Sequence, residues 1–266
     1  PGSLPVTAVT APVTPRGGPV FRVLEALGRW GCAHYRGERP PRLTFHARVV
    51  IGVSLGLVVT VALPLLALEW GTSFAELSWA ERVMAALFQS VSMRTAGFNT
   101  VDIGAMTPAA TALTCIVMFI GASPGSTGGG IKTTTLATLF ATYRAELRGA
   151  RAATLLDREV PDGVVRRALG VVFLSVITVS MVTLLLLCSE RAEPLDVLFE
   201  VTSAFATCGL STGITASLTP LGKVAIIVTM LVGRIGPVTV ALAIARAGTQ
   251  GGGARVALPE ERLAIG

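Results

Sequence analysis

The chain has 266 residues and a net charge of +6; 52% of its residues are hydrophobic and only 14% are charged. Soluble domains carry about 25% charged residues, so this composition excludes an ordinary soluble domain and predicts a multi-pass protein of the cell membrane. The positive charge does not predict nucleic-acid binding, because the basic residues alternate with long apolar runs and no aromatic-rich basic patch accompanies them. It is typical of a membrane protein with basic cytoplasmic loops.

The residue types that usually carry catalysis or metal binding are scarce and scattered. Cysteines lie at positions 32, 115, 188 and 208 without C-x-x-C spacing, and neither His34 nor His46 has a second His or Cys three or four residues away. The sequence has no H-E-x-x-H or G-x-S-x-G motif. It therefore predicts reduced, buried cysteines and no enzyme, resident metal or cofactor.

Residues 1–48 are predicted to precede the membrane-embedded part. Residues 1–19 are rich in Pro, Thr, Val and Gly and begin without Met, which we interpret as a frayed or truncated beginning. Residues 21–48 are basic and carry apolar side chains at near-helical spacing. This pattern predicts a cytoplasmic amphipathic helix followed by a linker.

The segment 49–147 has the pattern of one membrane-embedded unit. Residues 49–68 are uncharged, and a helix of this length, rising about 1.5 Å per residue, crosses roughly 30 Å of hydrocarbon. An acidic connection, predicted to lie outside, leads to residues 83–93, an apolar run too short to span and therefore predicted to be re-entrant. Residues 103–131 are uncharged again, but the Gly- and Pro-rich stretch 121–130 prevents one continuous helix.

The segment 148–266 is predicted to hold a second unit of the same kind. Its basic loop and tail fall on the same side of the membrane as residues 21–48, as the positive-inside rule requires. Its elements are a basic cytoplasmic loop at 144–167, a span at 168–189, an acidic outer connection at 190–200, a short apolar run at 195–206 and a last span at 221–245, interrupted at 233–237.

The two units form an internal repeat, because matching residues recur in both at one constant interval along the chain. The fold class predicted is therefore all-α integral membrane, with two repeats of membrane helix, re-entrant pore helix and membrane helix. The pairs that share the interval are Thr95 and Thr207, Gly97 and Gly209, Thr100 and Thr212, Thr107-Pro108 and Thr219-Pro220, and Gly121 and Gly233.

A Thr-x-Gly turn follows each short apolar run, and at membrane depth such a turn indicates a pore. Non-helical backbone survives there only where protein or a wet cavity surrounds it. Glycine lets successive carbonyls face one axis and replace the hydration shell of a monovalent cation, whereas a divalent-cation ring would need Asp or Glu. A helix C-cap before a surface loop is the alternative, which two copies in register disfavour. The candidate ion-binding residues are Thr95, Ala96, Gly97, Phe98, Thr207, Cys208, Gly209 and Leu210.

Several runs together resemble the TrkH/KtrB family of bacterial potassium uptake subunits. They are residues 94–100, 125–133, 207–211, 233–237 and 259–262. The resemblance implies four membrane–pore–membrane repeats around one ion path, of which this chain is similar to the third and fourth. It implies K⁺ transport, with Na⁺ as a second candidate ion, by a fragment that holds half of a K⁺-channel-like pore. The alternatives are a non-conducting truncated membrane protein and a half that pairs with another half.

The resemblance also implies a gate beneath the filter. Small residues with a Pro and consecutive glycines can flex, and in the family the matching stretch is a mobile intramembrane loop. An Arg in mid-span usually faces the bundle interior, although a snorkelling or kink-filling role is the alternative. Lys132 fits an interfacial anchor as well as a gating role. The candidate gating residues are Gly121, Ser123, Pro124, Gly125, Ser126, Thr127, Gly128, Gly129, Gly130 and Arg234.

A rival interpretation makes residues 125–133 the phosphate-binding loop of a membrane-associated nucleotide-binding protein. Its spacing fails, because Ile131 separates Gly130 from Lys132 where the Lys should follow at once. Such a loop also needs a soluble α/β core, which membrane-depth sequence does not supply.

The partners follow from the resemblance. It implies a homodimer in membrane lipid, seated on cytosolic nucleotide-binding regulatory subunits of the TrkA/KtrA type, with no nucleic acid. The basic segments 21–48 and 144–167 are where we expect this contact, with basic loops that only face lipid and solvent as the alternative.

Overall fold

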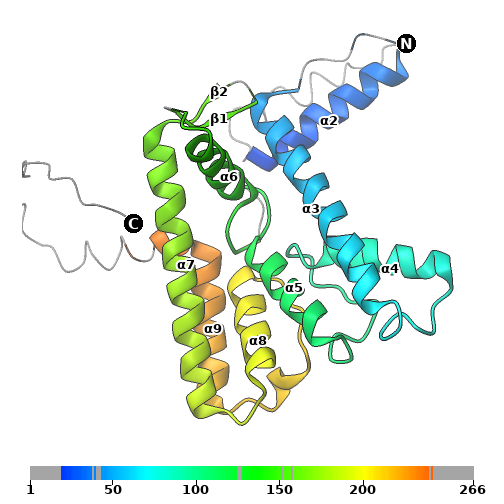
Figure 1. Ribbon diagram of the computed structural model, residues 1–266, viewed down its shortest axis with the longest axis vertical. Helices are drawn as coiled ribbons and strands as arrows, with labels where there is room; N and C mark the ends of the chain where they lie inside the picture. Colours follow the sequence, from blue (N-terminus) through cyan, green and yellow to red (C-terminus); the bar gives the residue numbers. More distant parts are fainter. Residues whose placement is uncertain are drawn as a thin grey trace, which may run out of the picture.

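A computed structural model describes residues 19–37, 39, 43–124, 128–150, 152–156, 158–239 and 241. Within them the chain is mostly helical, with one short β-hairpin at one end (Figure 1). The predicted frayed beginning, the middle of the Gly-rich stretch and the basic tail lie outside the described residues.

The first part of the described chain is dominated by a long apolar helix. This helix, α3, has 25 residues and is apolar enough to cross a membrane. Thr44 caps its start, since the Thr44 hydroxyl accepts a hydrogen bond from the Ala47 amide at 3.3 Å. Leu55, Val59 and Leu63 form an exposed apolar stripe at four-residue spacing, which suits contact with lipid. The helices are α2 (Pro19–Tyr35), α3 (Phe45–Glu69), α4 (Trp79–Ser92), α5 (Pro108–Phe119) and α6 (Thr133–Leu147).

The second part contains the other helix long and apolar enough to span. This helix, α7, has 28 residues. It begins earlier than the predicted span, because Asp162 lies in its first turn, where the helix dipole favours an acid, and long side chains such as Arg166 can reach the interface. The elements are β1 (Thr154–Leu155), β2 (Arg158–Glu159), α7 (Asp162–Ser189), α8 (Pro194–Ala206), the 3₁₀ helix η1 (Ile214–Ala216) and α9 (Pro220–Ile235).

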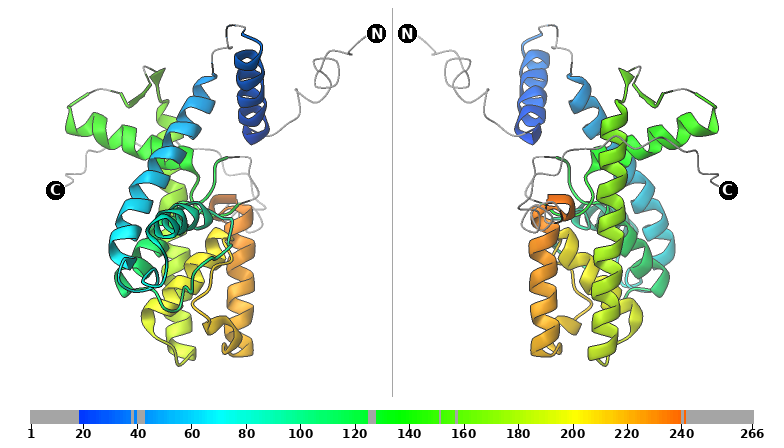
Figure 2. Two further views of the ribbon diagram at one scale, coloured as in Figure 1. Left: turned by 90° about the vertical axis from the view of Figure 1, so that its right-hand side faces the viewer. Right: turned by 90° about the vertical axis from the view of Figure 1, so that its left-hand side faces the viewer.

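The helices follow the same course twice. In Figures 1 and 2, α3 and α7 begin at the same end and run in the same direction, and each leads to a shorter helix, α4 or α8. A third helix, α5 or α9, then returns beside the first. The returning helix of the first copy breaks after Phe119 and resumes in another direction as α6 at Thr133.

Helix α8 lies at the centre of the packing. It contacts α5 on one side and α7 and α9 on the other (Figure 1). Val197, Phe199, Val201 and Phe205 are fully buried, and the Phe205 ring stacks on that of Phe119 with centroids 6.0 Å apart. A helix that carries apolar side chains on several faces is stable only when neighbours cover those faces. Helix α8 therefore contributes to two hydrophobic clusters, one with α3, α4 and α5 and the other with α7 and α9.

Matched carboxylate clamps join the helices at the end where α3 and α7 finish. Glu69 accepts hydrogen bonds from the amide and hydroxyl of Thr107, at 2.8 and 2.7 Å. Glu190 accepts from the amide of Thr219 at 3.0 Å and from its hydroxyl at 2.5 Å. Each Thr is the N-cap of a returning helix whose first residue is Pro, a favoured combination. The clamps fix where α5 and α9 begin, and the sequence interpretation missed them.

Candidate functional site

The two Thr-x-Gly turns share one backbone conformation. Thr95 and Thr207 have φ angles of 71° and 52°, and Gly97 and Gly209 have φ angles of 75° and 101°. A β-branched residue in the left-handed region costs about 1–2 kcal/mol, and strain of this kind gathers at functional sites. The residue between each Thr and Gly has an ordinary φ. Each turn therefore has a positive φ at its Thr and at its Gly, with the residue between them outside that region.

A serine fastens each turn to the helix before it. Ser92, at the end of α4, donates its hydroxyl to the Phe98 carbonyl oxygen, and Ser203 of α8 donates to the Leu210 carbonyl oxygen at 2.6 Å. Each of these carbonyl oxygens keeps a second lone pair for an ion. The two serines are not register partners in the repeat, because α8 has one residue more than α4 between its serine and its turn.

The structure brings the two turns into contact. A Cβ atom added to Gly97 would lie 2.0 Å from the Cys208 carbonyl oxygen, so only glycine fits there. The Cys208 sulfur lies 3.5 and 3.4 Å from the carbonyl oxygens of Ser92 and Met93. All eight candidate ion-binding residues, 95–98 and 207–210, therefore gather in one place.

The Gly-rich stretch packs directly against these turns. The Gly129 amide lies 2.7 Å from the Thr207 hydroxyl and 3.0 Å from the Ala206 carbonyl oxygen, to which it donates. A Cβ atom on Gly128 would lie 2.4 Å from the Thr95 hydroxyl oxygen. The stretch thus touches both turns at their Thr residues. Of the candidate gating residues in it, Gly121, Ser123, Pro124, Gly128, Gly129 and Gly130 are described, and Gly125, Ser126 and Thr127 lie outside the described residues.

Two positively charged side chains, those of Lys132 and Arg234, lie near this stretch. Lys132 donates from its amino group to the Gly128 carbonyl oxygen, and its charge is close enough to that of Arg234 for the two to repel. Arg234 is exposed in this chain and lies in the last turn of α9, where the helix dipole favours a cation. The preceding residue, Gly233, packs on the end of α8, because a Cβ atom there would lie 1.9 Å from the Phe205 carbonyl oxygen.

Two charged residues beside the turns are not among the site residues predicted from the sequence. Arg94 directly precedes the first turn, and its guanidinium donates to the Ser54 carbonyl and hydroxyl oxygens at 3.2 and 3.0 Å, which ties the turn to α3. Glu200 is buried in α8 and binds the segment after the second turn. The sequence offered one sign of these two residues, because each is a charged residue within or next to a short apolar run.

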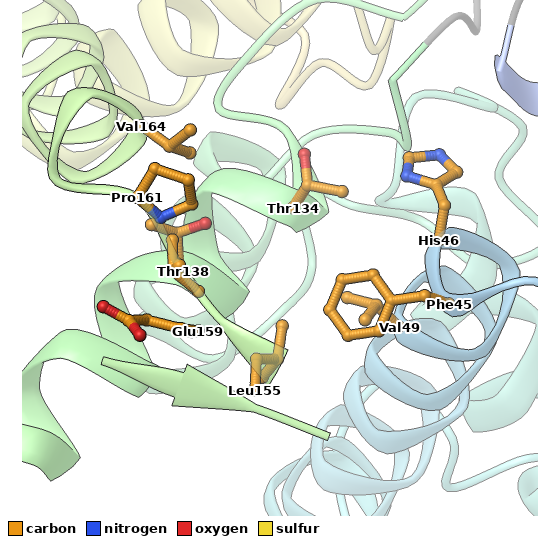
Figure 3. A pocket seen from close by; sticks show the side chains of 10 residues that line it. Phe45, His46, Val49, Thr134, Thr138, Leu155, Glu159, Pro161 and Val164 are labelled. Atoms are coloured by element: carbon orange, nitrogen blue, oxygen red, sulfur yellow. The ribbon is translucent and has the colours of Figure 1, made fainter. Parts of the chain in front are cut away.

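A separate hollow of about 230 Å³ lies at the end where α3 and α7 begin, between α3, α6, β2 and the start of α7 (Figure 3). Its lining is mainly apolar, and the buried Nε2 atom of His46 has no hydrogen-bond partner among the described residues. It contains no candidate ion-binding or gating residue. The described chain also holds no group of three His, Cys, Asp or Glu side chains that could bind a metal ion.

Comparisons with known proteins give one consistent result. The family model described as "TrkH: Cation transport protein" matches residues 39–251. The chain is 39% identical over 210 residues to Ktr system potassium uptake protein D of Bacillus subtilis, covering 79% of this chain and 46% of that protein. It is 38% identical over 206 residues to Ktr system potassium uptake protein B of Vibrio alginolyticus, covering 77% and 45%.

A solved structure shows the same fold. The crystal structure of the potassium transporter TrkH from Vibrio parahaemolyticus matches with a TM-score of 0.65 at 22% identity, covering 85% of this chain and 50% of that one. The chain thus spans about half the length of the relatives it matches.

Proposed function

Because the chain belongs to the TrkH family of cation transport proteins, we propose that it supplies two membrane–pore–membrane repeats to the ion path of a potassium uptake system. The first repeat is α3, α4 and the broken pair α5 and α6; the second is α7, α8 and α9. One observation carries the proposal: the two turns, one from each repeat, have the same alternating backbone and touch each other. As a member of this family, the chain is a multi-pass membrane protein.

The turns are half of a selectivity filter. Backbone carbonyls of residues 95–98 and 207–210 replace the water around K⁺, and Na⁺ is a second candidate ion. An ion held by carbonyls needs neither a cofactor nor a resident metal. The arrangement contains no carboxylate at the turns themselves, which suits a monovalent cation.

Two further repeats complete the filter. The exposed apolar residues of α4 and the exposed Phe98 support this, because such a face needs a cover. The match to about half of each relative supports it too. A non-conducting chain is the alternative where no such repeats join it.

The Gly-rich stretch is the gate. In the arrangement described, Gly129 is held by the second turn and Gly128 lies against the first, so the stretch closes the path beneath the filter. Lys132 and Arg234 place positive charge at the same level and repel cations. The path opens when the stretch withdraws.

The basic end of the molecule is the docking side for regulatory subunits. Exposed arginines gather on α6, β2 and the start of α7, at positions 144, 148, 158, 166 and 167. A homodimer in lipid, seated on cytosolic nucleotide-binding subunits, would bury this end. Nucleotide binding by the chain itself is disfavoured, because the Gly129 amide that would cradle a phosphate already contacts the second turn.

The test is ion flux into proteoliposomes that hold the complete transporter containing this chain. K⁺ uptake down its gradient, with Na⁺ uptake slower, is the expected result. A correctly folded transporter that moves neither ion would contradict the proposal. ATP binding to the purified chain would instead favour the nucleotide-binding alternative.

A further inference from the structure

The carboxylate of Glu200 binds the segment that leaves the second turn. One carboxylate oxygen accepts hydrogen bonds from the Ser211 hydroxyl and from the Thr212 amide, the latter at 3.1 Å. The other accepts from the Thr215 hydroxyl at 2.6 Å. The Glu200 side chain is only 5% exposed, so these bonds form where they are stronger than in water.

With these hydrogen bonds, α8 holds the second turn at a second position. Ser203 holds the Leu210 carbonyl, and Glu200, nearly one helical turn earlier, holds the next two residues. Ser211 extends this hydrogen-bond network to Gly213, because the Ser211 hydroxyl oxygen accepts a hydrogen bond from the Gly213 amide at 2.9 Å. One helix therefore fixes the second turn at its carbonyl and at its exit.

The first repeat has no such anchor at the matching position. Aligning Ser92 with Ser203 pairs Glu200 with Gln89. Gln89 is fully buried, and neither atom of its side-chain amide has a hydrogen-bond partner among the described residues. The two turns share a backbone but differ in what holds their exits.

We propose that Glu200 is a positioning residue for ion selectivity, which keeps the second turn rigid by binding its exit segment. This inference rests on the proposed function. Selectivity by backbone carbonyls depends on how they are spaced and held, and a binding group is kept in place by neighbours whose own contacts are satisfied. A loosened turn can close around the smaller Na⁺.

The test is Glu200→Gln in the complete transporter, measured as the ratio of K⁺ to Na⁺ flux in proteoliposomes. Gln keeps the shape but removes the charge and puts an amide donor among groups that are themselves donors. We expect the flux ratio to fall by about threefold to tenfold, the size of losing one ordinary hydrogen bond, while K⁺ flux persists. An unchanged ratio in folded protein overturns the inference.

Glu193→Gln is the matched control. It removes the same charge from the exposed start of α8, where the Glu193 side chain makes no capping hydrogen bond. The ratio should not change. An equal fall in both variants would reveal a general effect of charge and would overturn the inference.

Variants that remove the hydroxyl groups donating to Glu200 test the same hydrogen bonds. They also test the inference if Glu200→Gln does not fold. Ser211→Ala and Thr215→Val each remove one hydroxyl bound by Glu200. Both should lower the ratio, and each combined with Glu200→Gln should lower it less than additively, since the residues act as one unit. Unchanged ratios in both single variants overturn the inference. Absence of K⁺ flux in the unmodified transporter would instead count against the proposed function.

Discussion

Helices α4 and α8 hold the same place in the two repeats but have opposite surroundings. Side chains of α8 from residue 197 to 206 are buried except that of Leu198, whereas α4 buries a face of small and polar residues and exposes Trp79, Met84, Phe88 and Val91. The difference extends to the turns, since Leu210 is 2% exposed and its register partner Phe98 is 70% exposed. The second repeat is therefore packed from within this chain, whereas the first exposes an apolar face.

The glycines of the two turns give the largest expected effects. Gly97→Ala places a Cβ atom 2.0 Å from the Cys208 carbonyl oxygen and also strains a positive φ, whereas at Gly209 the nearest atom is 4.0 Å away and only the strain applies. We expect Gly209→Ala to cost about 1–2 kcal/mol and Gly97→Ala to cost about 1–3 kcal/mol more. Both should weaken K⁺ over Na⁺ preference, Gly97→Ala most. Thermal unfolding and flux ratios measure this, and equal effects would show that the turns do not touch.

The ends of the returning helices give the next contrast, because α5 breaks at the Gly-rich stretch, whereas α9 carries Arg234 in its last turn. Arg234→Ala should raise K⁺ flux by about fivefold, the size of removing roughly 1 kcal/mol of repulsion, without changing the flux ratio, since the substitution alters no residue of either Thr-x-Gly turn. Arg234→Lys is the control and should leave flux near normal. Lower or unchanged flux from folded Arg234→Ala would make Arg234 a structural residue.

The clamps offer a comparison of stability. Glu69 is fully buried and also accepts from Thr72 and Ser73, whereas Glu190 is half-buried and, among the described residues, accepts hydrogen bonds from Thr219 alone. Glu69→Gln should therefore lower the free energy of unfolding by about 2–3 kcal/mol and Glu190→Gln by about 1 kcal/mol. Denaturant unfolding in detergent measures both. The reverse order would mean that burial does not set the strength of the clamp.

The sequence was most informative where the signal is local or repeated. The constant interval between matching residues located both turns, and the apolar run at 195–206 matches α8, Pro194–Ala206, within one residue. The run at 83–93 missed the start of α4, because its first turn is polar and is stabilised by Glu81, which accepts from the Ser78 amide at 2.8 Å. The family resemblance is confirmed by the comparisons.

Contacts between segments that are distant in the chain could not be predicted from the sequence. Neither the pair of clamp acids nor the pair of turn serines falls on the repeat interval that located the turns, so the repeat gave no sign of them. Glu200 looked like part of an acidic connection, because sequence does not show that its carboxylate faces residues 211–215. Arg234 was expected in the bundle interior, and in this chain it is exposed. Side-chain direction decides such cases, and the spacing of residues along the chain does not fix it.

The smallest expected effect concerns the exposed face of α4, and it decides what covers that face. Phe88→Gln should change the unfolding free energy of this chain in detergent by less than about 0.5 kcal/mol, because the ring is already exposed, whereas Phe199→Gln, at a buried position of α8, should cost about 3–5 kcal/mol. In the complete transporter the Phe88→Gln effect should grow to about 1–3 kcal/mol if further repeats pack on α4, since the substitution then buries a polar amide. Thermal unfolding of both proteins measures the difference. An effect that stays small in the complete transporter would mean that lipid covers α4, and would count against the proposal that further repeats pack on this helix.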